Sequence, residues 1–420
     1  MPRPGGILAL LSLVACRPDE EIGLADSGAK AAGLCEGAIP VPRAGYDSED
    51  AVLADAHADV FGADAVPRQV HLSWAIEPAT SASFVWRTDA DTLATRVELG
   101  LDSTYGDFVH GRSFLVAETE ANGRLHEAHA CGLEPGTTYH YRVGGDGHWS
   151  EDRTFTTAPA PGEAAPFRFA VAGDSRDAPD TWGLLLDAME AHAPDFYVFT
   201  GDAVRLGVSM DEWDAWLDAG EGHLDRRPIV MAHGNHEFQA QAWFALFAQP
   251  GNEQWFSFDY ANAHFAFLND TVARSGDLEV QAAWLEADLA ATDAPWRFAV
   301  HHKPAWSSCT AHGSNLDLRA LWSPVEEAGG VALDLTGHNH NYERSVPLRD
   351  GLPATAELGT TYVVAAGAGA ELYGNDLSEP NTAVASVSEH FVLVEVDGGA
   401  LELNAYDLAG NLLDTFSTTR

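Results

Sequence analysis

The chain has 420 residues, of which 46% are hydrophobic, so it is long enough to bury one or two sizeable cores. Its 23 lysines and arginines stand against 63 aspartates and glutamates, which gives a formal charge of −40 at pH 7. This charge argues against a nucleic-acid partner, because a phosphate backbone is bound by basic surface. For the same reason, a phosphorylated ligand would need a local cationic centre in its binding site.

The first residues have the pattern of an export signal. Arg3 precedes a short apolar run from Ile7 to Ala15, which is too short to span a bilayer. The run ends in "LVAC", which resembles the lipobox of bacterial lipoproteins, where the cysteine becomes the lipidated first residue. We predict a lipoprotein-type signal over 1–16 and an exported protein, either a lipoprotein of the bacterial cell envelope or secreted. A lipid on Cys16 would be its only membrane contact, and an ordinary signal peptide is the alternative.

Three cysteines follow the signal, namely Cys35, Cys131 and Cys309. An odd number in an oxidising compartment allows one bridge at most, and the sequence cannot choose it. We prefer a bridge between Cys35 and Cys131, which would tie the N-terminal segment to the first domain. Cys309 would then remain a free thiol.

Two domains are expected after a flexible tether. Residues 17–66 are rich in Ala, Gly, Asp and Pro without a sustained period, which is typical of a tether. Residues 67–157 contain short alternating segments separated by turn residues, which predicts a small β-sandwich. The phrase "GLEPGTTYHYRVGG" resembles the end of a fibronectin type III domain, so we expect a domain of that kind. "APAPGEAAP" would be the linker to the second domain, 167–420.

In the second domain, apolar strands alternate with helical stretches, which is the pattern of a layered α/β domain. The final segment, from 390 to 415, predicts strands joined by tight turns. The expected helices span 181–193, 209–219, 238–248, 278–291 and 316–328.

Five of the predicted strands end in residues that can bind metal. The strand ends read "AVAGDSR", "FTGDAV", "AHGNHE", "VHHKP" and "LTGHNH". Ligands bind beyond the carboxyl ends of strands in open α/β sheets, so these ends should converge. Carboxylate, imidazole and amide donors without thiolate suit zinc, iron or manganese, and they are too many for one ion. The donors are Asp174, Asp202, Asn235, His236, His301, His302, His338 and His340.

The order of these motifs resembles the calcineurin-like metallophosphoesterases, and within them the purple acid phosphatase branch, over 167 to about 370. The resemblance implies an all-β sandwich followed by a four-layer α/β/β/α domain with its metal site at strand ends. It implies hydrolysis of small phosphate esters, phosphomonoesters first, by a hydroxide that bridges two divalent or mixed-valence ions. A phosphodiesterase or a nucleotide hydrolase is the nearest alternative, and the oligomeric state stays open.

The resemblance also implies roles for single residues. His236 would act as the general acid that protonates the leaving group, with Glu237 to orient it. Asp202 would take part in catalysis as the bridge between the ions. The remaining ligands would be Asp174 and His340 at the first ion, and Asn235, His302 and His338 at the second.

Two positions depart from the family pattern. Members of the branch have a tyrosine ligand where this chain has Arg205, and other relatives have a histidine where it has Arg176. Arginine does not ligate a cation, so the first site lacks one ligand, which water or another residue could replace. Both arginines and Lys303 are candidates to bind phosphate, and His301 is a further substrate-binding candidate. A surface binding module that has lost activity is the alternative from another class.

Overall fold

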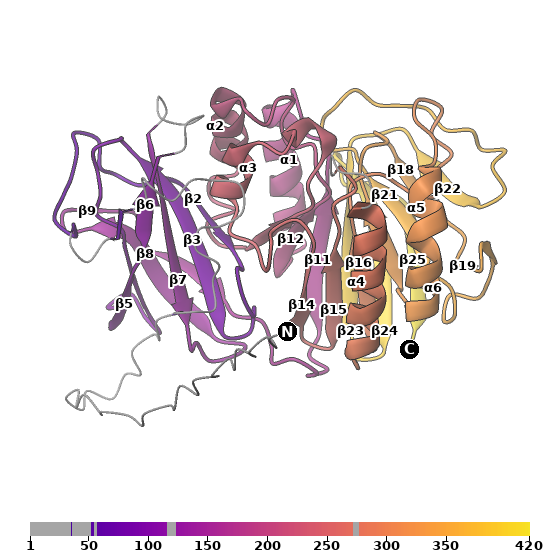
Figure 1. The fold of residues 1–420 in the computed structure, drawn as a ribbon, viewed down its shortest axis with the longest axis horizontal. Coiled ribbons are helices and arrows are strands. Elements are labelled where there is room, and N and C mark those ends of the chain that lie inside the picture. Colours follow the sequence, from indigo (N-terminus) through magenta and orange to yellow (C-terminus); the bar gives the residue numbers. More distant parts are fainter. Residues whose placement is uncertain (1–34, 36–51, 54–56, 116–122, 272–276) are drawn as a thin grey trace, which may run out of the picture. The chain divides into compact units, whose positions relative to one another are not determined.

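The computed structural model describes residues 35, 52–53, 57–115, 123–271 and 277–420 (Figure 1). The predicted signal and most of the predicted tether lie outside these residues. The described residues belong to one compact unit, Ala31–Arg420. No helix in this described part is both long and apolar enough to cross a bilayer.

The N-terminal part is a sandwich of two five-stranded sheets. Its strands are β1 (Val52–Leu53), β2 (Arg68–Ser73), β3 (Ser81–Thr88), β4 (Arg96–Gly100), β5 (Asp107–His110), β6 (Arg112–Phe114), β7 (Arg124–Cys131), β8 (Thr138–Gly145), β9 (His148–Trp149) and β10 (Arg153–Thr156). One sheet has the order β1-β6-β7-β3-β2, and the other has β10-β8-β4-β5 with β9 beside β8. Phe84 and Trp86 of β3 pack with Tyr141 and Val143 of β8, which buries the apolar residues of both sheets in one core.

The cysteine pairing agrees with the prediction. Cys35 forms a disulfide with Cys131 at the end of β7, with a Cα–Cα distance of 5.5 Å. Cys309 is buried and free in the described structure. The bridge therefore ties a residue of the predicted tether to the sandwich.

The C-terminal part contains two mixed sheets. One is ordered β13-β12-β11-β23-β24-β25 and the other β14-β15-β16-β17-β21-β18-β22, and β19 pairs with β20 in a small hairpin. The strands are β11 (Phe167–Ala172), β12 (Phe196–Phe199), β13 (Ile229–Met231), β14 (Phe256–Tyr260), β15 (Ala263–Phe267), β16 (Trp296–Val300), β17 (Leu333–Thr336), β18 (Tyr342–Ser345), β19 (Leu348–Arg349), β20 (Leu352–Pro353), β21 (Thr361–Ala365), β22 (Thr382–Ser386), β23 (His390–Asp397), β24 (Ala400–Asp407) and β25 (Leu412–Thr419). Strands β11, β12 and β13 are parallel, as are β15, β16, β17 and β21.

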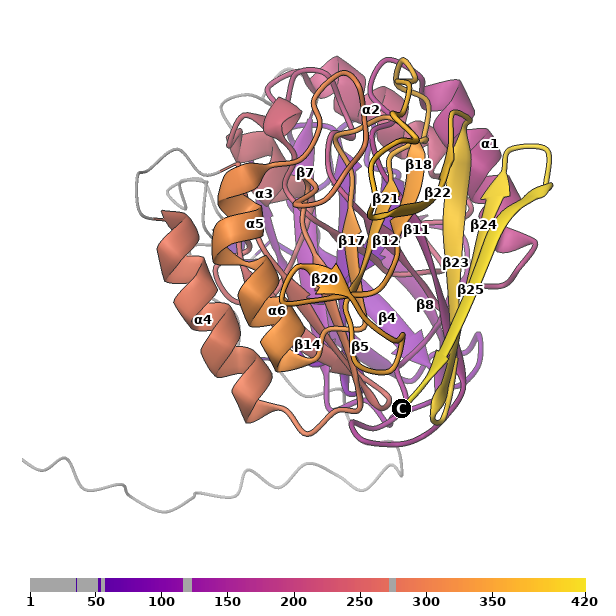
Figure 2. The same ribbon diagram turned by 90° about the vertical axis from the view of Figure 1, so that its right-hand side faces the viewer.

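The two sheets pack face to face, and helices cover both outer faces. The helices are α1 (Pro179–Glu190), α2 (Met210–Ala219), α3 (Gln241–Leu246), α4 (Asp277–Ala291), α5 (Leu316–Leu321) and α6 (Ser323–Gly329). Side chains of α1 to α3 pack on the first sheet, and those of α4 to α6 on the second (Figures 1 and 2). In α1, Trp182, Leu185, Leu186 and Met189 form the buried stripe at helical spacing. The predicted four-layer α/β/β/α fold is confirmed.

Two predicted helices differ in detail from the structure. The helix expected at 238–248 is reduced to α3, because Phe238 and Gln239 have φ angles of 51° and 55° and end the preceding 3₁₀ turn, Asn235–Glu237. The helix expected at 316–328 is two helices, α5 and α6. Pro324 lies in the first turn of α6, where its missing N–H and its ring favour a new start over continuation.

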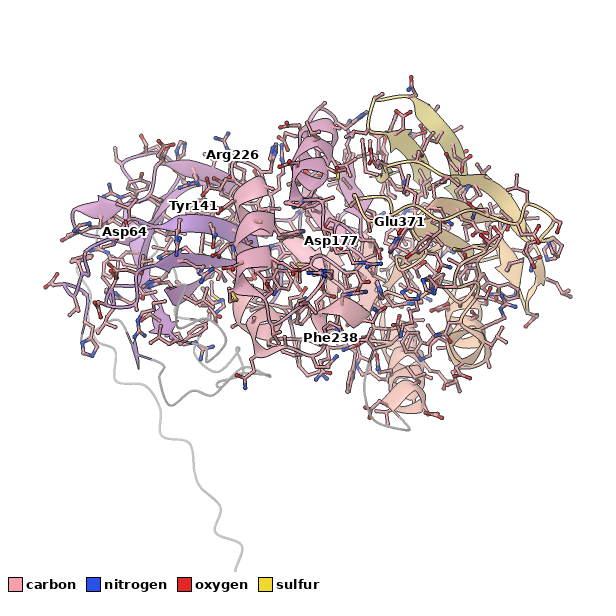
Figure 3. The ribbon with its side chains drawn as sticks, turned by 90° about the horizontal axis from the view of Figure 1, so that it is seen from above. Asp64, Tyr141, Asp177, Arg226, Phe238 and Glu371 are labelled. Atoms are coloured by element: carbon pink, nitrogen blue, oxygen red, sulfur yellow. A yellow bond between two sulfur atoms is a disulfide. The ribbon has the colours of Figure 1, made fainter. Side chains whose placement is uncertain are left out.

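The sandwich packs directly on the C-terminal part of the fold. Trp74, just after β2, belongs to the core between the two mixed sheets and lies 5.4 Å from the ring of Phe196. Arg87 of β3 pairs with Asp214 of α2. The hydroxyl of Tyr141, labelled in Figure 3, donates to the carbonyl of Asp225 at 2.5 Å. Apolar and polar contacts thus fix the two domains against each other.

A buried imidazole predicts a pH-dependent contribution to stability. His264 of β15 lies between Asp259 at 2.7 Å and Asp288 at 2.8 Å. Burial alone would lower the pKa of His264, but the hydrogen bonds to the two carboxylates raise it to about 9. Because the folded pKa exceeds the unfolded value, the contribution is complete below about pH 6.5 and is lost as the pH rises towards 9.

We expect His264→Gln to lower the free energy of unfolding by up to about 3 kcal/mol at pH 6 and by much less at pH 9.5. Urea unfolding of both proteins at the two pH values measures this difference. The control is His140→Gln, which removes an imidazole 2.9 Å from Asp152 on the more exposed sandwich surface, where the pair is screened by solvent. An equal loss for His264→Gln at both pH values would contradict the charge-based explanation.

Candidate metal centre

The predicted ligands lie at one end of the two mixed sheets. Asp174 follows β11, Asp202 follows β12 and Asn235 follows β13, all at the carboxyl ends of parallel strands. His302 follows β16 and His338 follows β17, at the corresponding ends in the second sheet. Strands that run in parallel bring residues far apart in the sequence to one edge, which is why short separate motifs form one cluster.

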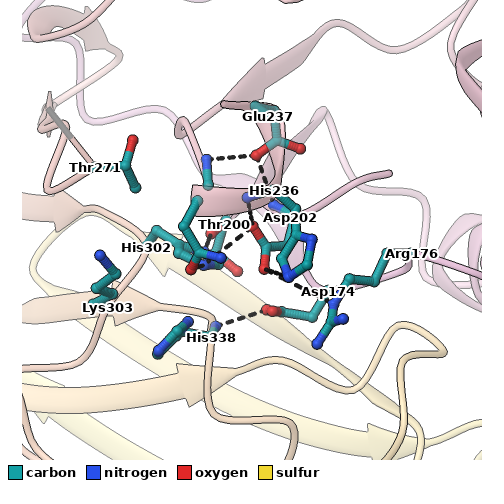
Figure 4. A network of polar contacts seen from close by, with 12 residues as sticks. Asp174, Arg176, Thr200, Asp202, His236, Glu237, Thr271, His302, Lys303 and His338 are labelled. Atoms are coloured by element: carbon teal, nitrogen blue, oxygen red, sulfur yellow. Dashed lines mark hydrogen bonds and ion pairs between the residues drawn. The ribbon is translucent and has the colours of Figure 1, made fainter. Parts of the chain in front are cut away.

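One group of donors converges closely. His302 Nε2 lies 3.1 Å from Asn235 Oδ1 and 3.3 Å from Asp202 Oδ1 (Figure 4). His338 joins them, because ligand atoms of Asp202, His302 and His338 all lie within 4.8 Å of one another. A ring nitrogen and two oxygens so close together require a cation among them, either a proton on Nε2 or a metal ion.

The surroundings of the two histidines favour a cation among the donors. His302 Nδ1 donates to the carbonyl of Thr200 at 2.8 Å, so Nε2 is the atom that faces the other donors. Burial alone would lower the pKa of His302, but Asp202 raises it to about 10, so the negative charge here favours a cation, either a proton or a metal ion. Burial and the neighbouring His302 lower the pKa of His338 to about 3, which favours the neutral imidazole that ligates metals.

Glu237 holds two of the ligand loops together. Its fully buried carboxylate accepts hydrogen bonds from the backbone N–H groups of Gly234 at 2.7 Å, Ala203 at 2.9 Å and Asp202 at 3.1 Å. It does not bond to the imidazole of His236, which corrects the expectation that it orients this residue. His236 Nδ1 donates instead to the carbonyl of Arg205 at 2.8 Å.

The ligand loops have strained backbones. Asp174, Asp202 and His338 have φ angles of 62°, 57° and 65°, in the left-handed region that side chains rarely adopt. Gly234 allows the close approach of these loops, since a Cβ there would lie 2.2 Å from the backbone nitrogen of Asp202. Such strain persists only where the surrounding contacts impose it, and it aims the side chains at a common point.

The residues predicted for the first ion form a second group beside the first. Asp174 Oδ1 lies 3.3 Å from His340 Nε2, and Asp174 Oδ2 accepts from the backbone N–H of His338 at 2.8 Å. His340 Nδ1 donates to the carbonyl of Glu371 at 2.6 Å, and Arg176 Nη2 lies 3.1 Å from His340 Nε2. A guanidinium is thus part of this group.

The other predicted site residues differ in position. His236 lies at the edge of the cluster, with Nε2 3.9 Å from Asp202 Oδ2. Lys303 lies beside His302 in Figure 4, with its Nζ 3.9 Å from Asp270 Oδ1. The structure does not bring the guanidinium of Arg205 into the cluster. It is exposed and lies 3.1 Å from the equally exposed Asp177, which is labelled in Figure 3.

His301 also lies away from the cluster. Its fully buried side chain lies 3.0 Å from Asp334 and 3.3 Å from Asp270, and its ring meets Trp322 edge-on. The extended backbone turns it to the face opposite His302, so a substrate at the strand ends does not reach it. Its place is in the packing beneath the ligand loop.

Three supporting residues were not found from the sequence. Asp270 accepts from the backbone N–H groups of His302 at 3.0 Å and Lys303 at 2.5 Å. The sequence did contain an indication of Asp270, because it follows the apolar run of β15 in the way that the predicted ligands follow the apolar runs of their own strands. Thr200 and Glu371 act through backbone carbonyls, which any residue type supplies.

Family models match both domains of the chain. Residues 67–157 match the model of the purple acid phosphatase N-terminal domain, and residues 167–342 match that of the calcineurin-like phosphoesterases. These two ranges therefore form a purple acid phosphatase-type N-terminal domain and a calcineurin-like phosphoesterase domain. A domain of this family indicates a hydrolase that acts on phosphoric esters.

Relatives of this phosphoesterase occur in plants and bacteria. It is 28% identical over 303 residues to purple acid phosphatase 21 of Arabidopsis thaliana, covering 67% of each chain. It is 29% identical over 336 residues to an uncharacterized protein of Mycobacterium tuberculosis, and the match covers 67% of this chain and 63% of the relative. The chain thus spans about two thirds of the length of these relatives.

Solved structures support the fold. Purple acid phosphatase PPD1 from yellow lupin seeds has a TM-score of 0.74 at 21% identity, covering 84% of this chain and 74% of its own. PhoD has a TM-score of 0.64 at 15% identity, covering 85% of this chain and 90% of its own. At such low sequence identities, the similarity shows that the helices and strands are arranged in the same fold.

The two halves of the candidate site differ in how well they fit a metal ion. Asp202, Asn235, His302 and His338 supply carboxylate, amide and imidazole donors, which suit zinc, iron or manganese. Asp174 and His340 instead share their space with Arg176. The first half fits an ion as it stands, and the second does not.

We expect Glu237→Gln to weaken metal binding by about 10- to 100-fold, because an amide has one acceptor oxygen and would turn its NH₂ group towards a backbone donor. Calorimetric titration of the metal-free protein with Zn²⁺ measures the change. The matched control is Glu212→Gln, since Glu212 also accepts from two backbone N–H groups, those of Arg205 and Leu206, but near the surface. Unchanged affinity in Glu237→Gln would contradict the role assigned to this carboxylate.

Proposed function

We propose that this chain hydrolyses phosphomonoesters of small molecules with the help of a metal bound by Asp202, Asn235, His302 and His338. The observation that carries the proposal is that Asn235 Oδ1 and Asp202 Oδ1 both lie within 3.3 Å of His302 Nε2. Iron, zinc and manganese are the ions that suit this donor set. The second ion expected from the sequence would need Asp174, Asp202 and His340.

The chain's own groups would divide the remaining work. When bound, the metal supplies an activated water and positive charge for the phosphoryl oxygens. His236 donates its Nδ1 proton to the carbonyl of Arg205, so its Nε2 faces the cluster. In the doubly protonated form, His236 can give the Nε2 proton to the leaving alkoxide. Arg176 and Lys303 bring fixed positive charge to a chain whose net charge is −40.

The choice of monoesters over diesters rests on charge. A monoester is a dianion near neutral pH, and two basic side chains beside a metal site favour the more highly charged substrate. A diesterase or a nucleotide hydrolase of the same fold would instead prefer diesters or nucleotides over simple monoesters. Turnover of bis(4-nitrophenyl) phosphate faster than that of 4-nitrophenyl phosphate would favour a diesterase over the proposed monoesterase.

We also propose that the protein works outside the cytoplasm. The disulfide between Cys35 and Cys131 supports this, because such bonds persist in oxidising compartments. The short apolar segment before Cys16 supports it further, although it lies outside the described residues. Metabolic labelling with a fatty acid, compared between the wild type and Cys16→Ala, distinguishes a lipoprotein from a secreted protein.

We expect His236→Ala to lower kcat by about 100-fold for an alkyl phosphate and by much less for 4-nitrophenyl phosphate, because a good leaving group needs little protonation. Steady-state kinetics with both substrates measures the difference. The control is His223→Ala, which removes an imidazole that pairs with Asp187 between α1 and the end of α2. Equal losses on both substrates would contradict the role of His236 as general acid.

We expect Asp202→Asn to abolish turnover of all phosphate esters and to lower the metal content, because it removes the carboxylate that lies nearest His302 Nε2. Metal analysis and 4-nitrophenyl phosphate assays across a series of metals and pH values test this. Full activity in this variant would refute the site assignment. A wild type with neither bound metal nor turnover would refute the proposed function.

A further inference from the structure

We propose that the guanidinium of Arg176 occupies the place of the first ion, so that the active centre holds one metal ion beside one fixed organic cation. The inference deepens the proposed function, since it concerns the same site and rests on the metal bound by Asp202, Asn235, His302 and His338. Arg176 would then be a catalytic residue that binds a phosphoryl oxygen. The substrate would be gripped between a metal ion and a guanidinium.

The first observation is that the unprotonated ring nitrogen of His340 accepts a hydrogen bond from Arg176. His340 Nδ1 faces the carbonyl of Glu371 at 2.6 Å, so it carries the proton. Its Nε2 is therefore an acceptor, and the donor that faces it is Arg176 Nη2 at 3.1 Å. Arginine has donors and no acceptor, so both ends of the contact agree on this assignment. The ring is held in this orientation by Tyr373, stacked at 4.2 Å.

The space around His340 Nε2 excludes a second ion. Zinc binds an imidazole nitrogen at about 2.0–2.1 Å along the lone pair. Arg176 Nη2 lies 3.1 Å from the same nitrogen and donates to it, so an ion placed between the two atoms would be about 1 Å from Nη2. The guanidinium and the ion cannot occupy this space together.

The Asp202 carboxylate lies beside the same guanidinium, and the Asp174 carboxylate lies beside His340. Arg176 Nε lies 3.9 Å from Asp202 Oδ2 (Figure 4), and Asp174 Oδ1 lies 3.3 Å from His340 Nε2. Asp202, Asp174 and His340 are the three side chains expected around the first ion. The backbone N–H of Arg176 donates to the carbonyl of Asp202 at 3.3 Å, which anchors the base of the side chain beside them.

Burial and charge support a fixed position for Arg176. Its side chain is 19% exposed, and the side chains of Asp202 and Asp174 in the same site are 2% and 0% exposed. A partly buried guanidinium beside Asp202 neutralises part of this negative charge, which a second ion would otherwise do. The contrast with Arg205 is clear, because that guanidinium is 55% exposed and pairs with Asp177 at the surface.

The chemical consequence is a centre that needs one metal equivalent. The guanidinium presents planar N–H donors that match two phosphoryl oxygens. It would orient the ester and neutralise charge that develops during transfer. Activity should therefore reach its maximum at one bound ion per chain.

The test is a metal count. The purified protein is stripped with a chelator, reloaded with excess Zn²⁺, freed of unbound metal and analysed by mass spectrometry. We expect about one ion per chain in the wild type and about two in Arg176→His, which removes the guanidinium and supplies an imidazole. Arg205→His, which adds an imidazole outside the cluster, is the matched control and should stay at about one ion. His340→Ala should also keep one ion, because His340 holds a guanidinium.

A second readout does not depend on counting. After loading with Mn²⁺, the wild type should give the electron paramagnetic resonance spectrum of an isolated ion, and Arg176→His that of a coupled pair.

Two ions in the wild type would overturn the inference, as would a single ion in a folded, active Arg176→His. Two ions with full turnover would leave the proposed function intact. One ion with no turnover of any phosphate ester would refute the proposed function alone, and no bound ion would refute both.

Discussion

The candidate centre depends on the three hydrogen bonds that the Glu237 carboxylate accepts from the loops after β12 and β13. These bonds hold Asp202 in a left-handed conformation and bring Asn235 within reach of the same point. The carboxylate is fully buried, so its bonds are not exchanged with water and keep their strength. Without this clamp, two strained loops from neighbouring strands would relax apart, and the donors would lose their common focus.

Much of the architecture could be predicted from the sequence. Alternating apolar residues indicated the sandwich, and apolar strands alternating with helical stretches indicated the layered domain, because burial of one face sets these periods. The ligands were found for a simple reason. A buried strand that ends in Asp, Asn or His places that side chain at the sheet edge, and parallel strands share this edge. The order of five such ends was specific even though each alone is common.

The partners of several site residues could not be predicted, because the sequence does not show in which direction their side chains point. Nothing in "GDSR" shows that Arg176 turns inward to His340 while Arg205 in "GDAVR" turns outward to Asp177. Glu237 was expected beside His236, but backbone N–H groups made better partners for a buried carboxylate than an imidazole at the cleft edge. Carbonyl groups such as that of Glu371 leave no mark in a sequence. The packing of the folded chain determines these contacts. They decide whether the centre holds one metal ion or two.

Trp74 has a consequence for how the molecule is organised as a folding unit. It comes from the sandwich, yet its ring is buried among Phe196, Phe258 and Tyr260 between the two mixed sheets. A catalytic domain cut off in the linker 158–166 would expose these rings to water, and the sandwich would expose its own tryptophan. The linker therefore separates the two domains in the sequence, but it does not divide the chain into parts that are stable on their own. The two domains should melt in a single cooperative transition, and neither should be autonomous.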